Sequence, residues 1–221
     1  MIKATLIDSM GSDLSVVNAA RVSFGKKSEW EPNGAVDDPW SQTKLSERDA
    51  KLIKYLAKHK HISPFGHAFA SFHVKAPIFV ARQLVKHKFL RWNEISRRYV
   101  DDEPEFYQPD VWRGRSADKK QGSDGVVGDV YYATFAEDWH TPLYLYKHLL
   151  EEGVAPEQAR MVLPQSTMTE WHWSGSLDAF ASMCQLRCKP DTQYESRLVA
   201  DQISEKMQEL FSVSWAALMD T

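Results

Sequence analysis

Apolar and polar residues alternate along two segments of the chain, which is the pattern of a β-strand with one buried face. From His67 to Lys75, the sequence HAFASFHVK places Phe72, Val74 and two alanines on one face. The sequence TMTEWHW, which covers Thr167–Trp173, alternates in the same way. The short apolar stretch Ile2–Ile7 predicts a third strand.

A helical period begins near Ser46. The Ser46 hydroxyl can accept a hydrogen bond from the first helical turn, and Asp49 stands three residues later, which together form a capping box. Leu52, Ile53 and Leu56 then follow at the spacing of one helix face. This segment is therefore predicted to be a helix that packs against the core.

Other helices are marked by a proline in the first turn or a glycine after the last. They are predicted over Ile78–Lys88 after Pro77, Thr141–Gly153, Pro156–Val162, Ser176–Cys188, and from Thr192 to the C-terminus. Strands mixed irregularly with helices favour an α+β class, a mixed helix and sheet fold. We expect residues 1–221 to form a single domain.

Two segments show no sustained period. Gly25–Trp40 is rich in Lys, Gly, Pro and Asp, and Asp101–Val130 contains Gly, Pro, Asp and Ser throughout. Both are predicted to be loops. The second is long for a compact domain, and loops of that length are commonly functional or disordered.

Composition narrows the function classes. The 221 residues are 43% hydrophobic and carry a formal charge of -3, so no overall charge attracts nucleic acid or an anionic membrane. No apolar run approaches the ~20 residues of a membrane span, and the first residues do not have the order of a signal peptide. We expect a cytoplasmic protein. Cys184 and Cys188 stand at helical spacing, which does not readily meet disulfide geometry, so both are expected to be small core residues.

Candidate chemistry gathers in Gln83–Tyr99, QLVKHKFLRWNEISRRY, where six cationic or imidazole side chains surround Glu94. One interpretation is a solvated basic helix end. The other is a phosphate site, because Gln83, Lys86 and His87 would share a helix face beside amide and hydroxyl groups. From the residue types alone, both interpretations remain open.

Other chemistries have no motif here. The sequence has no H-E-x-x-H, C-x-x-C pair, P-loop or G-x-G-x-x-G, and its histidines lack metal-ligand spacing, so no metal site is expected. Neither cysteine stands in a Pro-Cys-His setting, so no cysteine nucleophile is expected. Trp171 and Trp173 are interpreted as strand packing, with a cofactor site or a subunit interface as the alternative.

The Gln83–Tyr99 segment resembles the signature of the flavin-dependent thymidylate synthases, R-H-R-x-x-S-x-N-E-x-S-x-R-Y. The matching residues are His87, Asn93, Glu94, Ser96, Arg98 and Tyr99. The resemblance continues through HISPFGH and SFHVKAPIFVARQ upstream and through ARMVLP downstream, where Trp173, Leu186, Arg187 and Gln193 also correspond to the family. It runs roughly from His61 to Arg197, which is more specific than one short motif.

The chain also departs from this signature. Lys86 and Lys88 replace the two arginines of R-H-R, and Arg91 stands where the pattern has serine. Ser176 and Asp178 stand where many members have asparagine and arginine against the flavin. Lysine keeps the positive charge but lacks the planar bidentate fork of arginine, so the geometry of phosphate contact changes.

The resemblance implies reductive methylation of dUMP to dTMP, with methylenetetrahydrofolate as one-carbon donor, FAD as hydride carrier and NADPH as reductant. It implies FAD contacts from Ser63, Lys86, His87, Lys88 and Glu94. It implies nucleotide contacts from Gln83, Lys86, Glu94, Ser96, Arg97, Arg98, Arg160 and Arg187. Arg187 is the expected catalytic residue, because a guanidinium beside the uracil favours the anionic form of the base.

The family resemblance further implies a homotetramer whose active sites lie at subunit interfaces, with dUMP and folate as partners. We expect neither nucleic-acid nor membrane partners. Two alternatives follow from the departures in the signature. One is a flavin-impaired protein that binds a pyrimidine nucleotide, and the other is a one-carbon transferase acting on another pyrimidine nucleotide.

Overall fold

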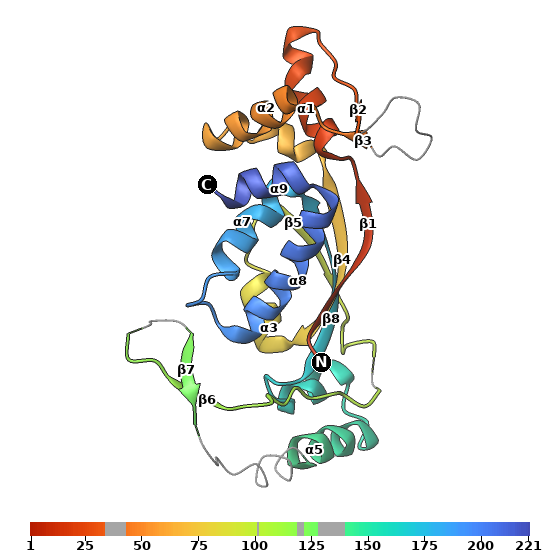
Figure 1. The fold of residues 1–221 in the computed structure, drawn as a ribbon. Coiled ribbons are helices and arrows are strands. Elements are labelled where there is room, and N and C mark those ends of the chain that lie inside the picture. Colours follow the sequence, from red (N-terminus) through yellow and green to blue (C-terminus); the bar gives the residue numbers. More distant parts are fainter. Residues whose placement is uncertain (34–42, 101, 119–121, 128–139) are drawn as a thin grey trace.

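A computed structural model describes residues 1–33, 43–100, 102–118, 122–127 and 140–221 (Figure 1). Its centre is a four-stranded sheet in the order β1-β4-β8-β5, and every neighbouring pair is antiparallel. The strands are β1 (Lys3–Met10), β4 (Phe69–Pro77), β8 (Met168–Ser176) and β5 (Leu90–Glu94). Helices cover one face of this sheet, so the α+β prediction is confirmed.

The helices over the sheet are α3 (Ile78–Leu84), α7 (Leu177–Arg187), α8 (Tyr194–Leu210) and α9 (Ser212–Met219). Helices α1 (Asp13–Arg21) and α2 (Glu47–Lys58) lie at one end, and α5 (His140–Glu151) with α6 (Pro156–Ala159) lies at the other (Figure 1). Short elements complete the described chain: η1 (Val22–Phe24), η2 (Ser63–His67), η3 (Arg160–Val162), and the strand pairs β2 (Glu31–Pro32) with β3 (Thr43–Lys44) and β6 (Arg113–Arg115) with β7 (Ser123–Val126).

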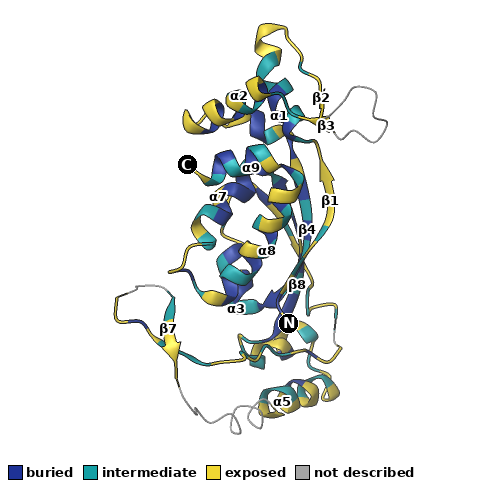
Figure 2. Ribbon diagram, viewed as in Figure 1, coloured by how far each residue is buried: buried dark blue, intermediate teal, exposed yellow. Residues whose placement is uncertain are grey.

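The core lies between the sheet and its helices, as the buried residues in Figure 2 show. Phe72 and Val74 of β4 are fully buried, and Trp171 and Trp173 of β8 are 1% exposed. The rings of Phe72 and Trp173 both meet Phe180 of α7 edge to face. The predicted alternation is confirmed in both strands, and the two tryptophans pack within the core.

Local signals placed several helices correctly. The Asp49 N–H donates to Ser46 Oγ at 3.1 Å, so the predicted start of α2 is confirmed. The helix predicted from Thr192 to the C-terminus is instead two helices, because the chain leaves helical geometry at the buried Phe211 (φ -134). Helix α1 was not predicted.

The helix predicted through Lys88 is wrong beyond Leu84. The His87 N–H bonds the Leu84 carbonyl at 3.1 Å in a turn, and Phe89 has φ 64, which lets the chain reverse into β5. Strand β5 lies tightly on β8, since a Cβ at Gly175 would stand 2.4 Å from Leu90 Cδ2. Pairing with β8 therefore overrides the helical pattern of this segment.

The predicted Asp101–Val130 loop contains the hairpin β6–β7. Residues 101, 119–121 and 128–130 of that prediction lie outside the described residues, as do residues 34–40 of the predicted Gly25–Trp40 loop. In the described part of the chain, no helix is both long and apolar enough to cross a membrane.

Candidate functional site

Helix α3 separates two cavities. Phe79 and Gln83, four residues apart on one face, line a cavity of about 750 Å³, which we call the Gln83 cavity. Ile78 and Arg82, on another face, line a cavity of about 550 Å³, which we call the Arg160 cavity. The two cavities have no lining residue in common. One short helix thus presents different side chains to two separate sites.

A third cavity, which we call the His87 cavity, measures about 730 Å³ and lies beside the turn that follows α3. Lys86, His87 and Lys88 line it together with residues of α7. Lys86 and Arg187 border both this cavity and the Gln83 cavity. These two cations therefore stand between two neighbouring sites.

Arg187, at the end of α7, is the centre of a polar contact network. Its Nε donates to His87 Nε2 at 3.0 Å, and its Nη1 and Nη2 lie 3.5 Å from Gln83 Oε1 and the Gln83 carbonyl. Burial lowers the pKa of Arg187. The predicted catalytic arginine is thus held on two sides instead of extending into solvent.

His87 is neutral beside this guanidinium. Burial and the Arg187 charge lower the pKa of His87 to about 4. The Nε2 of His87 accepts from Arg187, which is possible only when that nitrogen carries no proton. Arg187 is therefore the charged member of the pair at neutral pH.

Gln83 connects Arg187 to the start of α8. Its Nε2 donates to Gln193 Oε1, and its Oε1 accepts from Ser196 Oγ at 3.2 Å. Gln193 in turn donates to Glu195 Oε2 at 3.3 Å. Residues distant in sequence thus build one wall of the Gln83 cavity.

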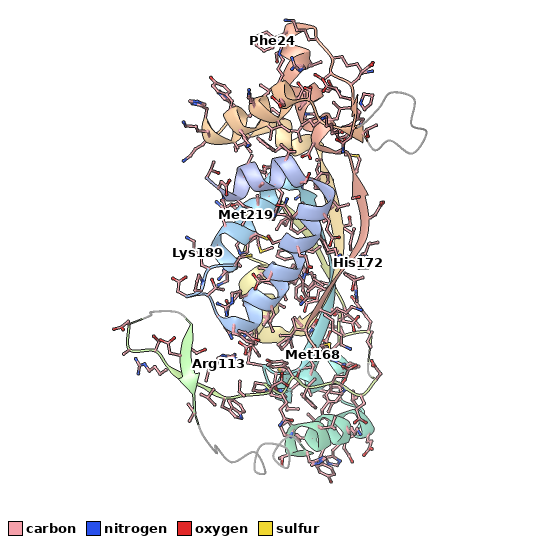
Figure 3. The ribbon with its side chains drawn as sticks, in the orientation of Figure 1. Phe24, Arg113, Met168, His172, Lys189 and Met219 are labelled. Carbon is pink, nitrogen blue, oxygen red and sulfur yellow. The ribbon has the colours of Figure 1, made fainter. Side chains whose placement is uncertain are left out.

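The hairpin β6–β7 is attached to the same wall. Arg113 forms an ion pair with the buried Glu195, lies 4.1 Å from the Tyr194 ring centroid, and extends from the hairpin near α8 (Figure 3). Tyr107 donates to Glu195 at 3.4 Å, and burial together with that carboxylate raises the pKa of Tyr107 to about 12. Sequence reasoning missed Tyr107, Arg113 and Glu195, because no local pattern connects them.

The Arg160 cavity gathers three other predicted residues, Glu94, Arg97 and Arg160. Glu94 accepts from Thr169 Oγ1 at 2.7 Å and from Trp92 Nε1 at 3.1 Å. Arg97 Nη1 donates to the Asp102 carbonyl at 2.6 Å, and Arg160 Nε donates to the Glu157 carbonyl at 3.2 Å. Both guanidinium groups keep further N–H groups that can reach an anionic ligand.

Three predicted site residues, Ser63, Ser96 and Arg98, line none of these cavities. Arg98 Nε donates to Ser96 Oγ at 3.0 Å, and the Arg98 guanidinium lies 5.0 Å from the Tyr99 ring centroid. Ser63 is exposed at the start of η2, and its neighbour Ile62 lines the His87 cavity. A single chain therefore does not bring all predicted site residues together.

The predicted shared helix face of Gln83, Lys86 and His87 is wrong, since α3 ends at Leu84. The turn nevertheless brings Gln83 and Lys86 to one cavity, and it brings Lys86 and His87 to another. The prediction that these side chains lie near one another therefore survives, for a different geometric reason.

The cysteines are both free, as predicted. Cys184 is buried, its Sγ donates to the Ala200 carbonyl at 3.6 Å, and burial raises the pKa of its thiol. Cys188 is half-buried and packs against the core. Within the described residues, no group of three or more His, Cys, Asp or Glu side chains could hold a metal ion.

Comparison with known proteins identifies the family. The sequence profile described as "Thymidylate synthase complementing protein" matches residues 5–212. The chain belongs to this family. Its relatives are enzymes named flavin-dependent thymidylate synthase, so the resemblance seen in the signature is confirmed despite its Lys-His-Lys variant.

The match to individual members extends over nearly the whole chain. The flavin-dependent thymidylate synthase of Thermus thermophilus is 40% identical over 213 residues, which are 96% of this chain and 73% of that protein. The enzyme of that name from Kosmotoga olearia is 38% identical over 219 residues, 97% of this chain and 89% of that protein.

A solved structure shares the family fold. The UMP/dUMP methylase PolB from Streptomyces cacaoi, bound with 5-Br UMP, superposes with a TM-score of 0.83 at 30% identity. The superposition covers 100% of this chain and 94% of that one.

Proposed function

We propose that this family member is a flavin-dependent thymidylate synthase that converts dUMP to dTMP, with methylenetetrahydrofolate as one-carbon donor, FAD as hydride carrier and NADPH as reductant. The observation that carries this proposal is the placement of Arg187, which is held by Gln83 and His87 at the border of two cavities. A nucleotide in one cavity and a flavin in the other would meet at this guanidinium.

The Gln83 cavity suits a pyrimidine nucleotide. Lys86 and Arg187 supply positive charge, the Gln83 amide supplies hydrogen-bonding groups, and Phe79 supplies an aromatic wall. A fixed guanidinium beside the uracil would stabilise negative charge on the base, which raises electron density at the carbon that is methylated. Because His87 is neutral, it does not compete with Arg187 for that charge.

The His87 cavity fits a flavin. Lys86 and Lys88 can approach its phosphates, while Phe89 and Leu186 supply apolar surface for its ring. The Oδ1 atom of Asp178 in this cavity is buried and has no hydrogen-bond partner among the described residues. A ring N–H or ribose hydroxyl of FAD would satisfy that oxygen. Bound there, FAD would supply the hydride for the methyl group, and the protein would orient and polarise the pyrimidine.

A composite active site follows from the division of the predicted residues. Gln83, Lys86 and Arg187 line one cavity, whereas Glu94 and Arg160 line another across α3. If both sets contact one nucleotide, two chains must contribute. We therefore propose a homotetramer with active sites at subunit interfaces, in which the Glu94 and Arg160 side of one subunit completes the Gln83 cavity of its neighbour.

The test is reconstitution of the purified protein with FAD. We expect a yellow protein that forms dTMP from dUMP when methylenetetrahydrofolate and NADPH are present. A protein that takes up no FAD and forms no dTMP would contradict the proposal. Nucleotide binding without measurable FAD affinity in calorimetry would instead identify a flavin-impaired nucleotide-binding protein.

A second candidate substrate is UMP, because the superposed solved structure is named a UMP/dUMP methylase and contains 5-Br UMP. The same assay with UMP and mass analysis of the product distinguishes the two. Preferential methylation of UMP, or release of a hydroxymethyl product, would replace dTMP synthesis as the proposed reaction.

A further inference from the structure

Four side chains form a continuous hydrogen-bonded chain along the wall of the Gln83 cavity. Gln193 Nε2 donates to Glu195 Oε2 at 3.3 Å, and Gln83 Nε2 donates to Gln193 Oε1. Arg187 Nη1 then donates to Gln83 Oε1 at 3.5 Å. The chain thus runs from a carboxylate through two amides to the guanidinium that is proposed to polarise the base.

The two ends of this chain dictate the orientation of both amides. An ionised carboxylate only accepts hydrogen bonds, a guanidinium only donates them, and an amide does both from opposite sides. Glu195 therefore requires the Nε2 of Gln193, which leaves Gln193 Oε1 to face Gln83. Gln83 must then turn Nε2 to Gln193 and Oε1 to Arg187. Ser196 does not decide this orientation, because a hydroxyl both donates and accepts.

Glu195 is well placed to remain such an acceptor. It is 6% exposed, forms an ion pair with Arg113 and accepts from the Tyr107 hydroxyl at 3.4 Å. Both contacts direct donors at this carboxylate and restrict its position. The hairpin β6–β7, which carries Arg113, thereby fixes the first member of the chain.

We infer that Glu195 is a positioning residue for the proposed methylation. By orienting the amides of Gln193 and Gln83, it holds the Arg187 guanidinium in the orientation needed to polarise the bound base. This inference rests on the proposed function. If the Gln83 amide flipped, its NH2 would face Arg187 and repel the guanidinium, so Arg187 would lose its alignment without leaving the protein.

The first experiment uses Glu195→Gln, which preserves shape and removes the obligatory acceptor. We expect kcat for dTMP formation to fall on the order of tenfold, as for other preorganised donors that lose their alignment, while KM for dUMP changes less. Glu209→Gln is the matched control, because it removes a carboxylate of the same helix whose partner is the exposed Lys206. The control should keep parental kcat. A folded Glu195→Gln with parental kcat overturns the inference.

The decisive experiment is rescue by polarity. Adding Gln193→Glu to Glu195→Gln places an acceptor-only group directly against Gln83 Nε2, which restores the orientation of Gln83 without the original carboxylate. We expect kcat to recover most of its loss. A merely structural role of Glu195 predicts no recovery, so a double variant as slow as the single one overturns the inference.

Two further variants complete the test. Gln193→Leu interrupts the chain and leaves the Arg113–Glu195 pair intact, so it gives a reading even if Glu195→Gln does not fold. It should lower kcat comparably, and parental kcat overturns the inference.

Combined with Arg187→Ala, Glu195→Gln should add no further loss, because it acts through Arg187. Additive losses would contradict this order of action.

A readout independent of activity separates this inference from the proposed function. In the NMR spectrum of protein with 15N-labelled arginine, the signal of the Arg187 Nη1–H groups, which contact Gln83 Oε1, should shift in Glu195→Gln, whereas the Nε–H bonded to His87 should change less. An unchanged signal overturns the positioning role. If the parent forms no methylated nucleotide while this signal still responds, the proposed function fails and the positioning network stands.

Discussion

The two cavities beside α3 are both lined by arginines, but these arginines are held in different ways. We call their two sides the Gln83 face and the Arg160 face. On the Gln83 face, the side chain of Arg187 is held by the side chains of Gln83 and His87. On the Arg160 face, Arg97 and Arg160 are held mainly by backbone carbonyls, and Arg160 is exposed. The first arrangement is preorganised, and the second keeps its guanidinium groups available to a ligand.

This difference indicates that the two faces have different functions. A charge held in a fixed direction stabilises a transition state, because no reorganisation is needed when charge develops. An exposed guanidinium with free donors instead suits attachment of a phosphate. We therefore expect the Gln83 face to govern turnover and the Arg160 face to govern nucleotide affinity.

The largest effect should come from Arg187→Ala. We expect turnover to fall on the order of a hundredfold or more, since one preorganised donor is removed. FAD occupancy should stay near that of the parent, and Arg187→Lys should rescue poorly because it lacks a planar fork. Steady-state kinetics, flavin absorbance and melting temperature measure these three expectations. Near-normal dTMP formation would remove Arg187 from the mechanism.

Gly175→Ala should disturb both faces together. The new Cβ would overlap Leu90 Cδ2, so the buried Leu90 side chain must move, and the Phe89 carbonyl oxygen 3.2 Å away leaves little room for the change. We expect a loss of about 1–3 kcal/mol in the free energy of unfolding, which is typical of overpacking. Urea unfolding measures it, with Gly66→Ala as the matched control, because a Cβ at Gly66 meets nothing within 4 Å and its φ is not positive. Equal losses would mean that the contact with β5 is not the cause of the destabilisation.

Arg160→Ala tests the second face. We expect KM for dUMP to rise about tenfold, as for loss of a charge-assisted contact, with little change in kcat. If Arg160 acts on a neighbouring subunit, dilution to concentrations at which the proposed tetramer dissociates should raise KM in the parent as well. A loss confined to kcat would contradict the division between the two faces.

The smallest expected effect is on the pH dependence of the free energy of unfolding. The pKa of His87 is lowered to about 4 by burial and by Arg187. An unfolded histidine titrates near 6.5, so the unfolded state binds more protons between these values, and stability falls as pH decreases from about 6.5 to 4. Because the ring is partly exposed, we expect a contribution below about 1 kcal/mol. Unfolding of His87→Asn at pH 7 and 5 should show a weaker pH dependence than the parent.

The elements that the sequence predicted correctly are those set by interactions between residues close together in the chain. Alternation located β4 and β8, and a capping pair located the start of α2. The reversal at Phe89 was missed because pairing of β5 with β8 at Gly175 is a tertiary contact. Nothing in the segment itself indicates a strand partner far along the chain.

The candidate site likewise contains residues that the sequence predicted and residues that only the structure identifies. The family resemblance pointed to Arg187 and His87, and the structure brings Arg187 Nε to 3.0 Å from His87 Nε2. Glu195 and Arg113, separated by 82 residues, were missed because their charges meet only in the folded chain. The allocation of Gln83 and Arg160 to cavities on different sides of α3 also required the structure, since Gln83 lies in α3 and Arg160 in the distant η3.

The capping of α9 links the beginning of the chain to its end. The side chain of the buried Asp13 accepts from the backbone N–H groups of Val213 at 3.1 Å and Ser214 at 2.8 Å, and Gln202 accepts from the Ala4 N–H at 2.9 Å. These contacts join residues about 200 positions apart, whereas β1 also pairs with β4 and α1 also contacts α2, which are much nearer in the sequence. Contacts between residues so far apart are slow to form, so we expect the cap of α9 by Asp13 to close late in folding, after β1 has paired with β4.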